Sequence, residues 1–316
     1  MPPSSPEDSP LLARFCRIVP LLCCLALALP AGRALAAEGG CAPHLRAQLN
    51  ISPLGAPVVT LNVNGAPVQL LLDTGAERTV LTAAAARRVG LRPDFRHARL
   101  VRGFGTRVRA AEVRAVRVAA GSMALPALDF MVVPLSLPRA EGEQIDGVLG
   151  ADMLDRFDID LNFGQHIVLL YDPADCANPE LPWLRDYVAV PGSLSRHLHV
   201  AFPITLDGHA LTAFIDTGAE RSLLDSSASG RLGLDPKALR HDEAVEMQGV
   251  SSRTVTAREH RFNQLGVADE VLLSPTVGVT ALRMDDADVL VGADLLNHER
   301  IWLSYAAHRI YIAYVN

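Results

Sequence analysis

The sequence lacks a hydrophobic run long enough to span a membrane, a basic stripe and any low-complexity tract. The apolar run Ile18–Leu29 has 12 residues, whereas a membrane-spanning helix needs about 20. The formal net charge of −6 does not point to a nucleic-acid partner. The 316 residues are 49% apolar and 20% charged, a globular composition with enough length for two domains.

Two common kinds of enzyme site are also missing. The chain has no Gly-x-Ser-x-Gly motif, which argues against a serine hydrolase. His197 and His199 have strand spacing and would point both rings to one face, but no further zinc ligands are apparent. We therefore expect a solvated strand face at these histidines, and neither a metal nor an organic cofactor.

The N-terminal residues have the features of an export signal. Arg14 and Arg17 precede the apolar run, and Ala34-Leu35-Ala36 provides a small-x-small cleavage pattern. We predict cleavage after Ala36 or Ala37, which would leave no stable membrane anchor and place the protein in a bacterial periplasm or outside the cell. The alternative is an uncleaved anchor.

Cysteine is scarce once the predicted signal is removed. Of the five cysteines, only Cys41 and Cys176 lie beyond it. Two cysteines in an exported chain suggest one disulfide, which would tie the N-terminal tail to the middle of the chain. Two free thiols are the alternative. We do not interpret either cysteine as a nucleophile.

One tetrapeptide, Asp-Thr-Gly-Ala, occurs twice, at Asp73–Ala76 and at Asp216–Ala219. The copies are 143 residues apart (216 − 73), and each stands between an apolar run and Glu-Arg: LLLDTGAERTVL and AFIDTGAERSLL. Upstream, Asn64-Gly65 and Asp207-Gly208 recur at the same offset, and both dipeptides are typical of two-residue hairpin turns. In each half, a hairpin should therefore lead into a strand that ends at the aspartate.

The repeat continues downstream of the tetrapeptide. The stretch Thr82–Val89 predicts a short helix, with Thr82 as its N-cap and Gly90 as its stop. Asp225–Leu232 is the counterpart of this helix in the second half.

Each half also contains an apolar-apolar-Gly segment, Val148-Leu149-Gly150 or Leu290-Val291-Gly292, and then a β-rich run, Phe157–Tyr171 or Ile301–Val315. The segment between the halves is rich in proline, as linkers are. This pattern predicts an all-β fold, mainly strands with short helices. The expected organisation is a signal peptide (1–36), an N-terminal tail (37–50), lobe 1 (51–172), a Pro-rich linker (173–196) and lobe 2 (197–316).

On these residues, the chain resembles the retropepsin-like aspartic proteases, the family of retroviral proteases and their bacterial relatives. The matching features are the Asp-Thr-Gly-Ala loop, the following strand, a Gly-rich hairpin and the apolar-apolar-Gly segment, over about Pro57 to Tyr314. The resemblance implies two acid-protease barrel lobes in one chain, related by a pseudo-two-fold axis between Asp73 and Asp216. Each lobe would supply one catalytic carboxylate.

Two adjacent carboxylates suit the hydrolysis of an amide. The reaction needs a base that takes a proton from water and an acid that protonates the leaving nitrogen. Like charges at close range cannot both ionise, so the pair holds one proton and can do both. Asp73 and Asp216 are therefore the predicted catalytic residues. For a single Asp-Thr-Gly, a turn that caps a strand would be the alternative.

The residues beside the aspartates have supporting roles in the resemblance. Glycine allows a tight loop whose N–H groups turn toward each carboxylate, threonine hydroxyls bond across the lobes, and alanine lets the chain pass closely. The supporting residues are Thr74, Gly75, Ala76, Thr217, Gly218 and Ala219. Gly150 and Gly292 are the predicted scaffold glycines, which let a neighbouring strand cross behind the loops.

Six nearby charged residues are expected to be structural. Asp152 and Asp294 follow the scaffold glycines and are interpreted as N-caps or structural carboxylates. Glu77-Arg78 and Glu220-Arg221 are expected in solvated or interlobe ion pairs.

A hairpin that covers the cleft is expected in each lobe. The candidate tip residues are Gly103, Phe104 and Gly105 in lobe 1 and Gly249 in lobe 2. Gly-rich tips suit a mobile lid that excludes water as it closes. Because lobe 1 has more glycine there, we expect one dominant flap; an ordinary β-turn is the alternative.

The sequence thus predicts an exported, monomeric aspartic endopeptidase that cleaves protein or peptide substrates bound in extended form. Water would be activated between Asp73 and Asp216, and the substrate would pair with the flap through main-chain hydrogen bonds. Two alternatives remain open. One is a catalytically silent peptide-binding module of the same fold, and the other is an enzyme whose lobes pair with lobes of another chain.

Overall fold

The structure is a computed structural model that describes most of the chain beyond the predicted signal. The described residues are 41–51, 57–103, 106–134, 137, 139–140, 143–173, 179–183, 186–248, 254–297 and 299–314. The predicted signal (1–36) lies outside the described residues, as do Phe104, Gly105, Cys176 and Gly249.

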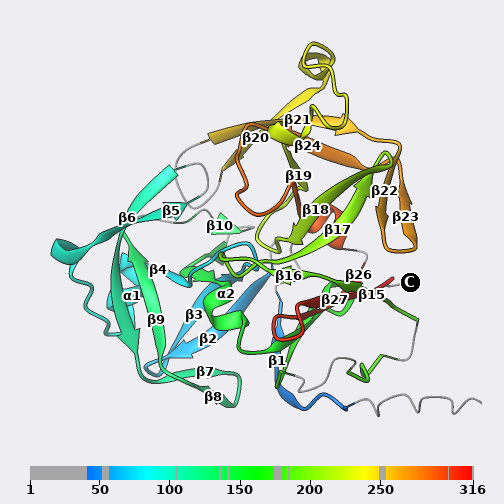
Figure 1. The fold of residues 1–316 in the computed structure, drawn as a ribbon. Helices are drawn as coiled ribbons and strands as arrows, with labels where there is room; N and C mark the ends of the chain where they lie inside the picture. Colours follow the sequence, from blue (N-terminus) through cyan, green and yellow to red (C-terminus); the bar gives the residue numbers. More distant parts are fainter. Residues whose placement is uncertain are drawn as a thin grey trace, which may run out of the picture. The chain divides into compact units, whose positions relative to one another are not determined.

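Lobe 1 is built on a nine-stranded sheet (Figure 1). In hydrogen-bonded order its strands are β5 (Arg99–Gly103), β6 (Thr106–Ala115), β9 (Leu128–Val133), β4 (Val80–Thr82), β12 (Gly147–Leu149), β3 (Ala66–Leu72), β2 (Val58–Val63), β7 (Val118–Ala120) and β8 (Met123–Leu125). The remaining elements of this half are the hairpin β10 (Arg139–Ala140) and β11 (Glu143–Gln144), the helices α1 (Ala83–Arg88) and α2 (Ala151–Leu154), and the 3-10 turns η1 (Phe95–His97) and η2 (Phe163–Gln165).

Lobe 2 is built on a ten-stranded sheet with the same plan. Its main path is β20 (Glu243–Gln248), β21 (Thr254–Arg261), β24 (Thr276–Thr280), β19 (Leu223–Asp225), β25 (Val289–Val291), β18 (His209–Ile215), β17 (Val200–Leu206), β22 (Gln264–Val267) and β23 (Glu270–Leu273), and β16 (Ser193–Leu194) pairs with β17. The other elements are α3 (Ala293–Leu296) and the 3-10 turns η3 (Ser226–Ala228) and η4 (Ala238–His241).

The two sheets correspond strand for strand. The order β5-β6-β9-β4-β12-β3-β2-β7-β8 in lobe 1 is matched by β20-β21-β24-β19-β25-β18-β17-β22-β23 in lobe 2. In both lobes the strand that precedes the aspartate pairs in parallel with the apolar-apolar-Gly strand, β3 with β12 and β18 with β25. The prediction of an all-β fold with two similar lobes is confirmed.

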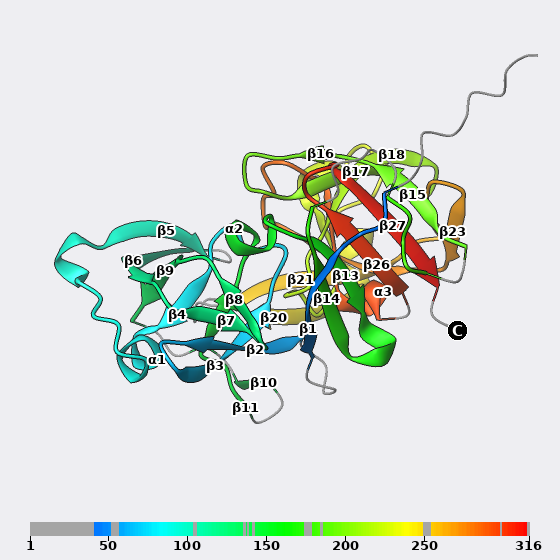
Figure 2. The ribbon, with the colours of Figure 1, turned by 90° about the horizontal axis from the view of Figure 1, so that it is seen from below.

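A third sheet joins the lobes. Its six strands are β1 (Leu45–Asn50), β14 (Ile167–Tyr171), β13 (Asp158–Asn162), β26 (Glu299–Ser304), β27 (Arg309–Tyr314) and β15 (Val188–Pro191). The central pair is β13 with β26, antiparallel over five residues from Asp158↔Ser304 to Asn162↔Arg300. Figure 2 shows the red strands β26 and β27 beside the green strands β13 and β14.

The shared sheet changes the picture of the predicted tail and linker. The predicted tail contains β1, which pairs with β14, and the predicted linker contains β15 and β16. β15 pairs with the last strand, β27. The segment between the lobes is thus partly folded into the sheets, although its prolines suggested a plain connection.

Polar side chains also tie the shared sheet together. The buried Asp160 carboxylate of β13 accepts hydrogen bonds from Arg300 of β26, at 2.9 Å from Nε and 2.6 Å from Nη2. It also accepts one from the Trp183 indole N–H at 3.1 Å. Because an unpaired buried carboxylate is costly, this bidentate pair favours one arrangement of the two lobes.

The predicted hairpin turns are confirmed in both lobes. Asn64 and Gly65 (φ 53° and 91°) connect β2 to β3, and Asp207 and Gly208 (φ 49° and 80°) connect β17 to β18. Positive φ at both central residues is the type I′ geometry that suits the twist of a hairpin.

The two predicted helices differ from one another. Thr82 caps α1 by accepting from the Ala85 N–H at 3.1 Å, and Gly90 follows with a φ of 76°. In lobe 2, Asp225 instead caps the three-residue 3-10 turn η3. The counterpart of the helix is therefore shorter than predicted, since Asp-Ser-Ser-Ala-Ser offers weaker helix formers than the alanines of α1.

Cys41 is disulfide-bonded. Its predicted partner, Cys176, lies outside the described residues. In the described part of the chain, no helix has both the length and the apolar character needed to cross a membrane.

Candidate active site

Asp73 and Asp216 occupy the same position in their lobes, one residue beyond the strands β3 and β18. The Asp73 N–H donates to the Leu149 carbonyl at 3.0 Å, and the Asp216 N–H donates to the Val291 carbonyl at 3.0 Å. Each aspartate is thus held by the last residues of the neighbouring parallel strand. The apolar strands are buried, whereas part of each aspartate stays accessible.

The structure brings the two carboxyl groups into contact, with a hydrogen bond between them. Within each loop, the Gly75 N–H donates to Asp73 Oδ1 at 2.9 Å and the Gly218 N–H donates to Asp216 Oδ1 at 3.0 Å. A Cβ on Gly75 would overlap the Asp216 carboxyl, and a Cβ on Gly218 would overlap that of Asp73. Each glycine therefore makes room for the carboxylate of the opposite lobe.

Reciprocal hydrogen bonds between Thr74 and Thr217 join the two loops. Each threonine hydroxyl donates across the lobes, from Thr74 to the Ile215 carbonyl and from Thr217 to the Leu72 carbonyl, both at 2.7 Å. Each hydroxyl also accepts from the other threonine's N–H, at 3.1 and 3.2 Å. The pattern has the two-fold symmetry that the sequence predicted for this loop pair.

Gly150 and Gly292 lie behind the loops. A Cβ on Gly150 would meet the Arg78 backbone, and one on Gly292 would meet the Arg221 backbone. The next residues, Ala151 and Ala293, donate their N–H groups to the carbonyls of Ala76 and Ala219, each at 2.8 Å. The structure thus places these glycines where a strand passes close to each catalytic loop.

Asp152 and Asp294 are structural carboxylates in the first turns of α2 and α3, although the N-cap positions belong to the glycines before them. Asp152 accepts from the N–H and hydroxyl of Thr79, and Asp294 accepts from the same groups of Ser222. They hold the chain just beyond each loop and do not contact the aspartate pair.

Burial raises the pKa of Asp73 well above its usual range, and the adjacent Asp216 carboxyl raises it further. Burial also raises the pKa of Asp216, but hydrogen bonds from Asp73 and Gly218 and the charge of His199 oppose that rise. The two carboxyls therefore titrate as a pair, in surroundings that differ between Asp73 and Asp216.

In the Glu-Arg pairs after the loops, Glu77, Arg78 and Arg221 form ion pairs, and that of Glu77 crosses between the lobes. Arg78 pairs with Asp152 at 3.1 Å, and Arg221 pairs with Glu259. Glu77 accepts from His197 of lobe 2 at 3.0 Å.

The expectation of a solvated strand face at His197 and His199 is wrong. Both residues lie in the turn between β16 and β17, where Leu198 has a φ of 64°. The His199 side chain is only 10% exposed and stacks on Phe214, with ring centroids 4.1 Å apart. The spacing of the histidines could not reveal this, because the turn and the contact with lobe 1 arise only from the tertiary fold. In the described residues, no cluster of histidine, cysteine and acidic side chains could hold a metal ion.

Both flap candidates lie at the ends of antiparallel hairpins. β5 pairs with β6 up to Gly103↔Thr106, and β20 pairs with β21 from Glu243↔Glu259 to Gln248↔Thr254. The tip residues between these pairs lie outside the described residues, so their role as flaps stays a prediction.

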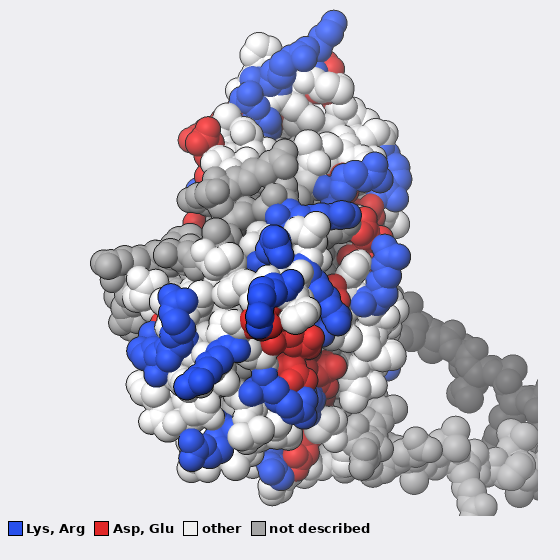
Figure 3. Space-filling model, turned by 90° about the vertical axis from the view of Figure 1, so that its left-hand side faces the viewer, with Lys and Arg blue, Asp and Glu red and all other residues white. Residues whose placement is uncertain are grey.

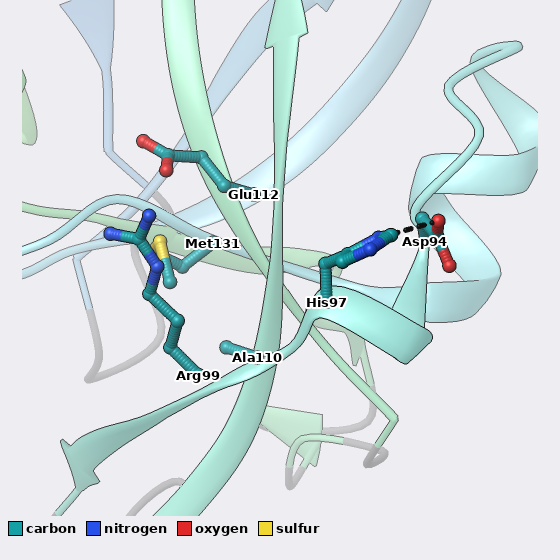
Figure 4. A pocket seen from close by; sticks show the side chains of 6 residues that line it. All are labelled: Asp94, His97, Arg99, Ala110, Glu112 and Met131. Atoms are coloured by element: carbon teal, nitrogen blue, oxygen red, sulfur yellow. Dashed lines mark hydrogen bonds and ion pairs between the residues drawn. The ribbon is translucent and has the colours of Figure 1, made fainter.

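A hollow on lobe 1 lies apart from the aspartate pair (Figure 4). It is lined by Asp94, His97, Arg99, Ala110, Glu112 and Met131, from η1 and the strands β5, β6 and β9. Asp94 holds His97 at 2.9 Å. No residue of the catalytic loops contributes to this lining.

Arginines gather on the side of lobe 1 that carries β5 and β6 (Figure 3). The exposed arginines of the segment 87–117 are Arg87, Arg88, Arg92, Arg96, Arg99, Arg107, Arg109, Arg114 and Arg117. Acidic residues are interspersed, such as Asp94 with Arg96 and Asp129 with Arg114. The sequence shows no basic stripe, yet basic side chains gather on this side of lobe 1 (Figure 3).

A family model described as aspartyl protease matches the chain twice, over residues 59–153 and 202–295. The chain belongs to the aspartyl protease family. Each match begins in the first strand of a lobe, contains that lobe's Asp-Thr-Gly-Ala loop and ends within α2 or α3. The recognition made from the sequence is thereby confirmed.

Relatives of this family member include DNA damage-inducible protein 1 of Yarrowia lipolytica, 33% identical over 106 residues, and Protein DDI1 homolog 2 of Homo sapiens, 28% identical over 114 residues. These alignments cover 33% and 35% of the chain. They span only about a quarter of the relatives' own length, 25% and 27%.

Among solved structures, the aspartic proteinase from Irpex lacteus superposes with a TM-score of 0.54. The superposition covers 85% of this chain and 97% of that proteinase, at 13% sequence identity. At this identity the likeness shows the fold, and it extends over both lobes of the aspartyl protease.

Replacing Thr74 by valine should destabilise the protein by about 1–3 kcal/mol, because the Thr217 N–H is then buried without an acceptor. Thr74→Ser keeps the hydroxyl and is the matched control. Chemical denaturation of the wild type and both variants measures the difference. Equal stability of the valine and serine variants would contradict the role of the cross-lobe hydrogen bonds.

The raised pKa of Asp73 also predicts a pH-dependent stability. Between pH of about 4, where an unfolded aspartate ionises, and the higher folded pKa, the folded state binds a proton that the unfolded state has released. Asp73 should then contribute a fall of about 1.4 kcal/mol in the free energy of unfolding for each pH unit in this window, in addition to the contributions of other groups such as Glu299, whose pKa is raised to about 7. Asp73→Asn should lack this slope in denaturation curves recorded across the window, and a parallel pH dependence of both proteins would exclude the shared proton.

Proposed function

We propose that this aspartyl protease family member is an exported, single-chain aspartic endopeptidase. The observation that carries the proposal is the contact between Asp73 and Asp216, two partly accessible carboxyls that come from opposite lobes. A water molecule placed against this pair meets a base in Asp216 and an acid in Asp73.

Each proton has a place in the proposed reaction. As the water oxygen attacks the carbonyl carbon of the substrate, its proton passes to Asp216 and the Asp73 proton passes to the carbonyl oxygen. The tetrahedral intermediate then collapses: Asp216 protonates the leaving nitrogen, the C–N bond breaks, and Asp73 takes a proton back from a hydroxyl. The pair ends in its starting state, so no cofactor is needed.

The arrangement of the lobes supports a monomeric enzyme. Both aspartates come from one chain, and Gly40–Asn316 forms one compact unit. The antiparallel pairing of β13 with β26 and the Arg300–Asp160 pair tie the two lobes together. These contacts favour an intramolecular dyad over pairing with lobes of another chain.

The proposed substrate is an extended protein or peptide segment that crosses the dyad. The hairpins β5–β6 and β20–β21 hold corresponding edge positions in the two large sheets. Such hairpins suit a strand-like ligand, because main-chain hydrogen bonds can be extended to it.

The dyad is tested by Asp73→Asn and Asp216→Asn in the chain from Ala37 onward. Each variant should lose peptide cleavage by at least about 10³-fold, since an amide cannot exchange the proton. A mixed peptide library between pH 4 and 7.5, read by mass spectrometry, measures cleavage, and the exposed Asp129→Asn is the control that should retain it. Retained cleavage in a dyad variant, or no cleavage by the folded wild type at any pH, would overturn the proposal. In the second case, binding of intact peptides would identify a binding module.

Export is part of the same proposal and rests on the pattern of residues 14–36. The chain expressed in a bacterial host should appear in the periplasm or medium, with an N-terminus at Ala37 or Glu38. N-terminal sequencing of the exported protein measures this. An intact N-terminus in the membrane fraction would show that the segment is an uncleaved anchor.

A further inference from the structure

His199 is the buried group that approaches the catalytic loops from outside the Asp-Thr-Gly-Ala motifs. Its Nε2 lies 3.0 Å from the Gly75 carbonyl oxygen, across the lobe boundary, and its Nδ1 lies 3.1 Å from Asp286 Oδ2. Side-chain exposure is 10% for His199 and 13% for Asp286. The ring is further fixed by stacking on Phe214, two residues before Asp216.

The partners of the ring require it to be charged. A carbonyl oxygen only accepts hydrogen bonds, and an ionised carboxylate also only accepts. Both ring nitrogens must therefore carry a proton, which is the imidazolium form. The direction of the pKa shift agrees with this charge: burial alone would lower the pKa of His199, but Asp286 and the Gly75 carbonyl raise it overall. The pKa of Asp286 is lowered to about 2, because hydrogen bonds from His199 and Ser195 outweigh its burial.

The loop backbone is shaped to hold this ring. The Ser195 hydroxyl accepts from the N–H groups of His197 and His199, both at 3.1 Å. Leu198 between them has a φ of 64°, a left-handed conformation that is rare for a bulky side chain. A strained residue held in place by a tight loop is a mark of functional sites.

Lobe 1 has no counterpart of this pair. At the offset of the repeats, the segment that corresponds to His199 is Ser-Pro-Leu-Gly-Ala at 52–56, with no titratable side chain. Asp286 corresponds to Gln144, whose amide donates to the adjacent Ile145 carbonyl. By contrast, Asp288 and Asp146, two residues further on, match in both lobes and pair with Arg231 and Arg88. The asymmetry is thus specific to the His199–Asp286 pair.

We propose that His199 is a positioning residue that breaks the symmetry of the aspartate pair: as an imidazolium held by Asp286, it fixes the Gly75 carbonyl and stabilises the negative charge on Asp216, so that the shared proton stays on Asp73. This inference rests on the proposed proteolytic function, because it assigns the base to Asp216 and the acid to Asp73. Near the pair, a positive charge lowers the cost of ionising one carboxyl.

Other charged groups around the ring are accounted for by their own partners. His197, 6.2 Å from His199, is held by Glu77 of lobe 1 and accepts from Arg196. Asp285 lies 3.6 Å from Arg196 and 3.8 Å from His197. On the Asp73 side, burial raises the pKa of Tyr305, which keeps this phenol neutral. The Asp216 carboxyl lies against Gly75, where a Cβ would overlap it, and the carbonyl of Gly75 is the group that His199 contacts. The charge of His199 accordingly opposes the rise in the pKa of Asp216.

The pH profile of kcat/KM tests the charge. The fall of kcat/KM at low pH, the acid limb of the profile, reports the ionisation that creates the Asp216 carboxylate. Removal of the nearby cation should therefore move this limb to higher pH. We expect His199→Gln, which keeps an N–H donor without charge, to shift the limb upward by about one unit, a tenfold loss of kcat/KM on the acid side. Asp286→Asn should shift it in the same direction. His197→Gln is the matched control, with an unchanged limb.

A purely structural role would give a different profile. If His199 only supported the loop, His199→Gln would lower kcat/KM equally at every pH, and an unshifted acid limb would overturn the proposal. His199→Phe, which keeps the ring stacking but neither hydrogen bond, extends the test should the glutamine variant fold poorly. Its limb should shift as well.

A measurement without substrate separates this inference from the proposed function. In the ¹⁵N spectrum of histidine-labelled protein at pH 7, both ring nitrogens of His199 should appear protonated, with the signal assigned from the His199→Gln variant. A ring nitrogen of His199 that carries no proton at pH 7 would overturn the inference even if the protein cleaves peptides. Two protonated nitrogens in a protein that cleaves nothing would instead place the failure in the proposed function.

Discussion

The structure depends most on four hydrogen bonds between Thr74 and Thr217 and the strands that precede the opposite aspartates. These bonds are buried, so leaving any of their groups unpaired would be costly. They fix the two loops face to face, and only in that arrangement can Gly75 and Gly218 admit the carboxyl of the other lobe. The contact between Asp73 and Asp216 is therefore a consequence of how the lobes are joined.

Symmetry creates a difficulty for such a pair. Two equivalent carboxyls that share a proton have no inherent preference for either one, whereas hydrolysis needs a defined base and a defined acid. In this protein the surroundings differ: the charge of His199 opposes the rise in the pKa of Asp216, whereas the Asp216 carboxyl adds to the rise in the pKa of Asp73. The lobes have the same strand order and the same loop geometry. They differ in the His199–Asp286 pair, which only lobe 2 contributes beside the two carboxyls.

Sequence alone was enough for features encoded locally. The hairpin turns at Asn64-Gly65 and Asp207-Gly208 and the Thr82 cap follow from short patterns and are found in the structure. Features that need distant segments were missed.

The shared sheet could not be predicted, because β13 and β26 are 140 residues apart and the sequence of neither strand specifies which strand it pairs with. His199 was missed for a similar reason. Its neighbours Phe214, Gly75 and Asp286 come from three separate parts of the chain, and the short spacing to His197 suggested a strand that is in fact a turn.

The joined lobes also bear on how this protein behaves at low concentration. A site assembled from two separate chains is lost on dilution, because the chains dissociate as their concentration falls. Here the strand pairing β13–β26 and the Arg300–Asp160 pair make the meeting of the two loops an intramolecular event, with an effective concentration set by the fold itself. One molecule released into a large volume therefore carries a complete site, and each lobe is free to acquire changes that its twin does not share.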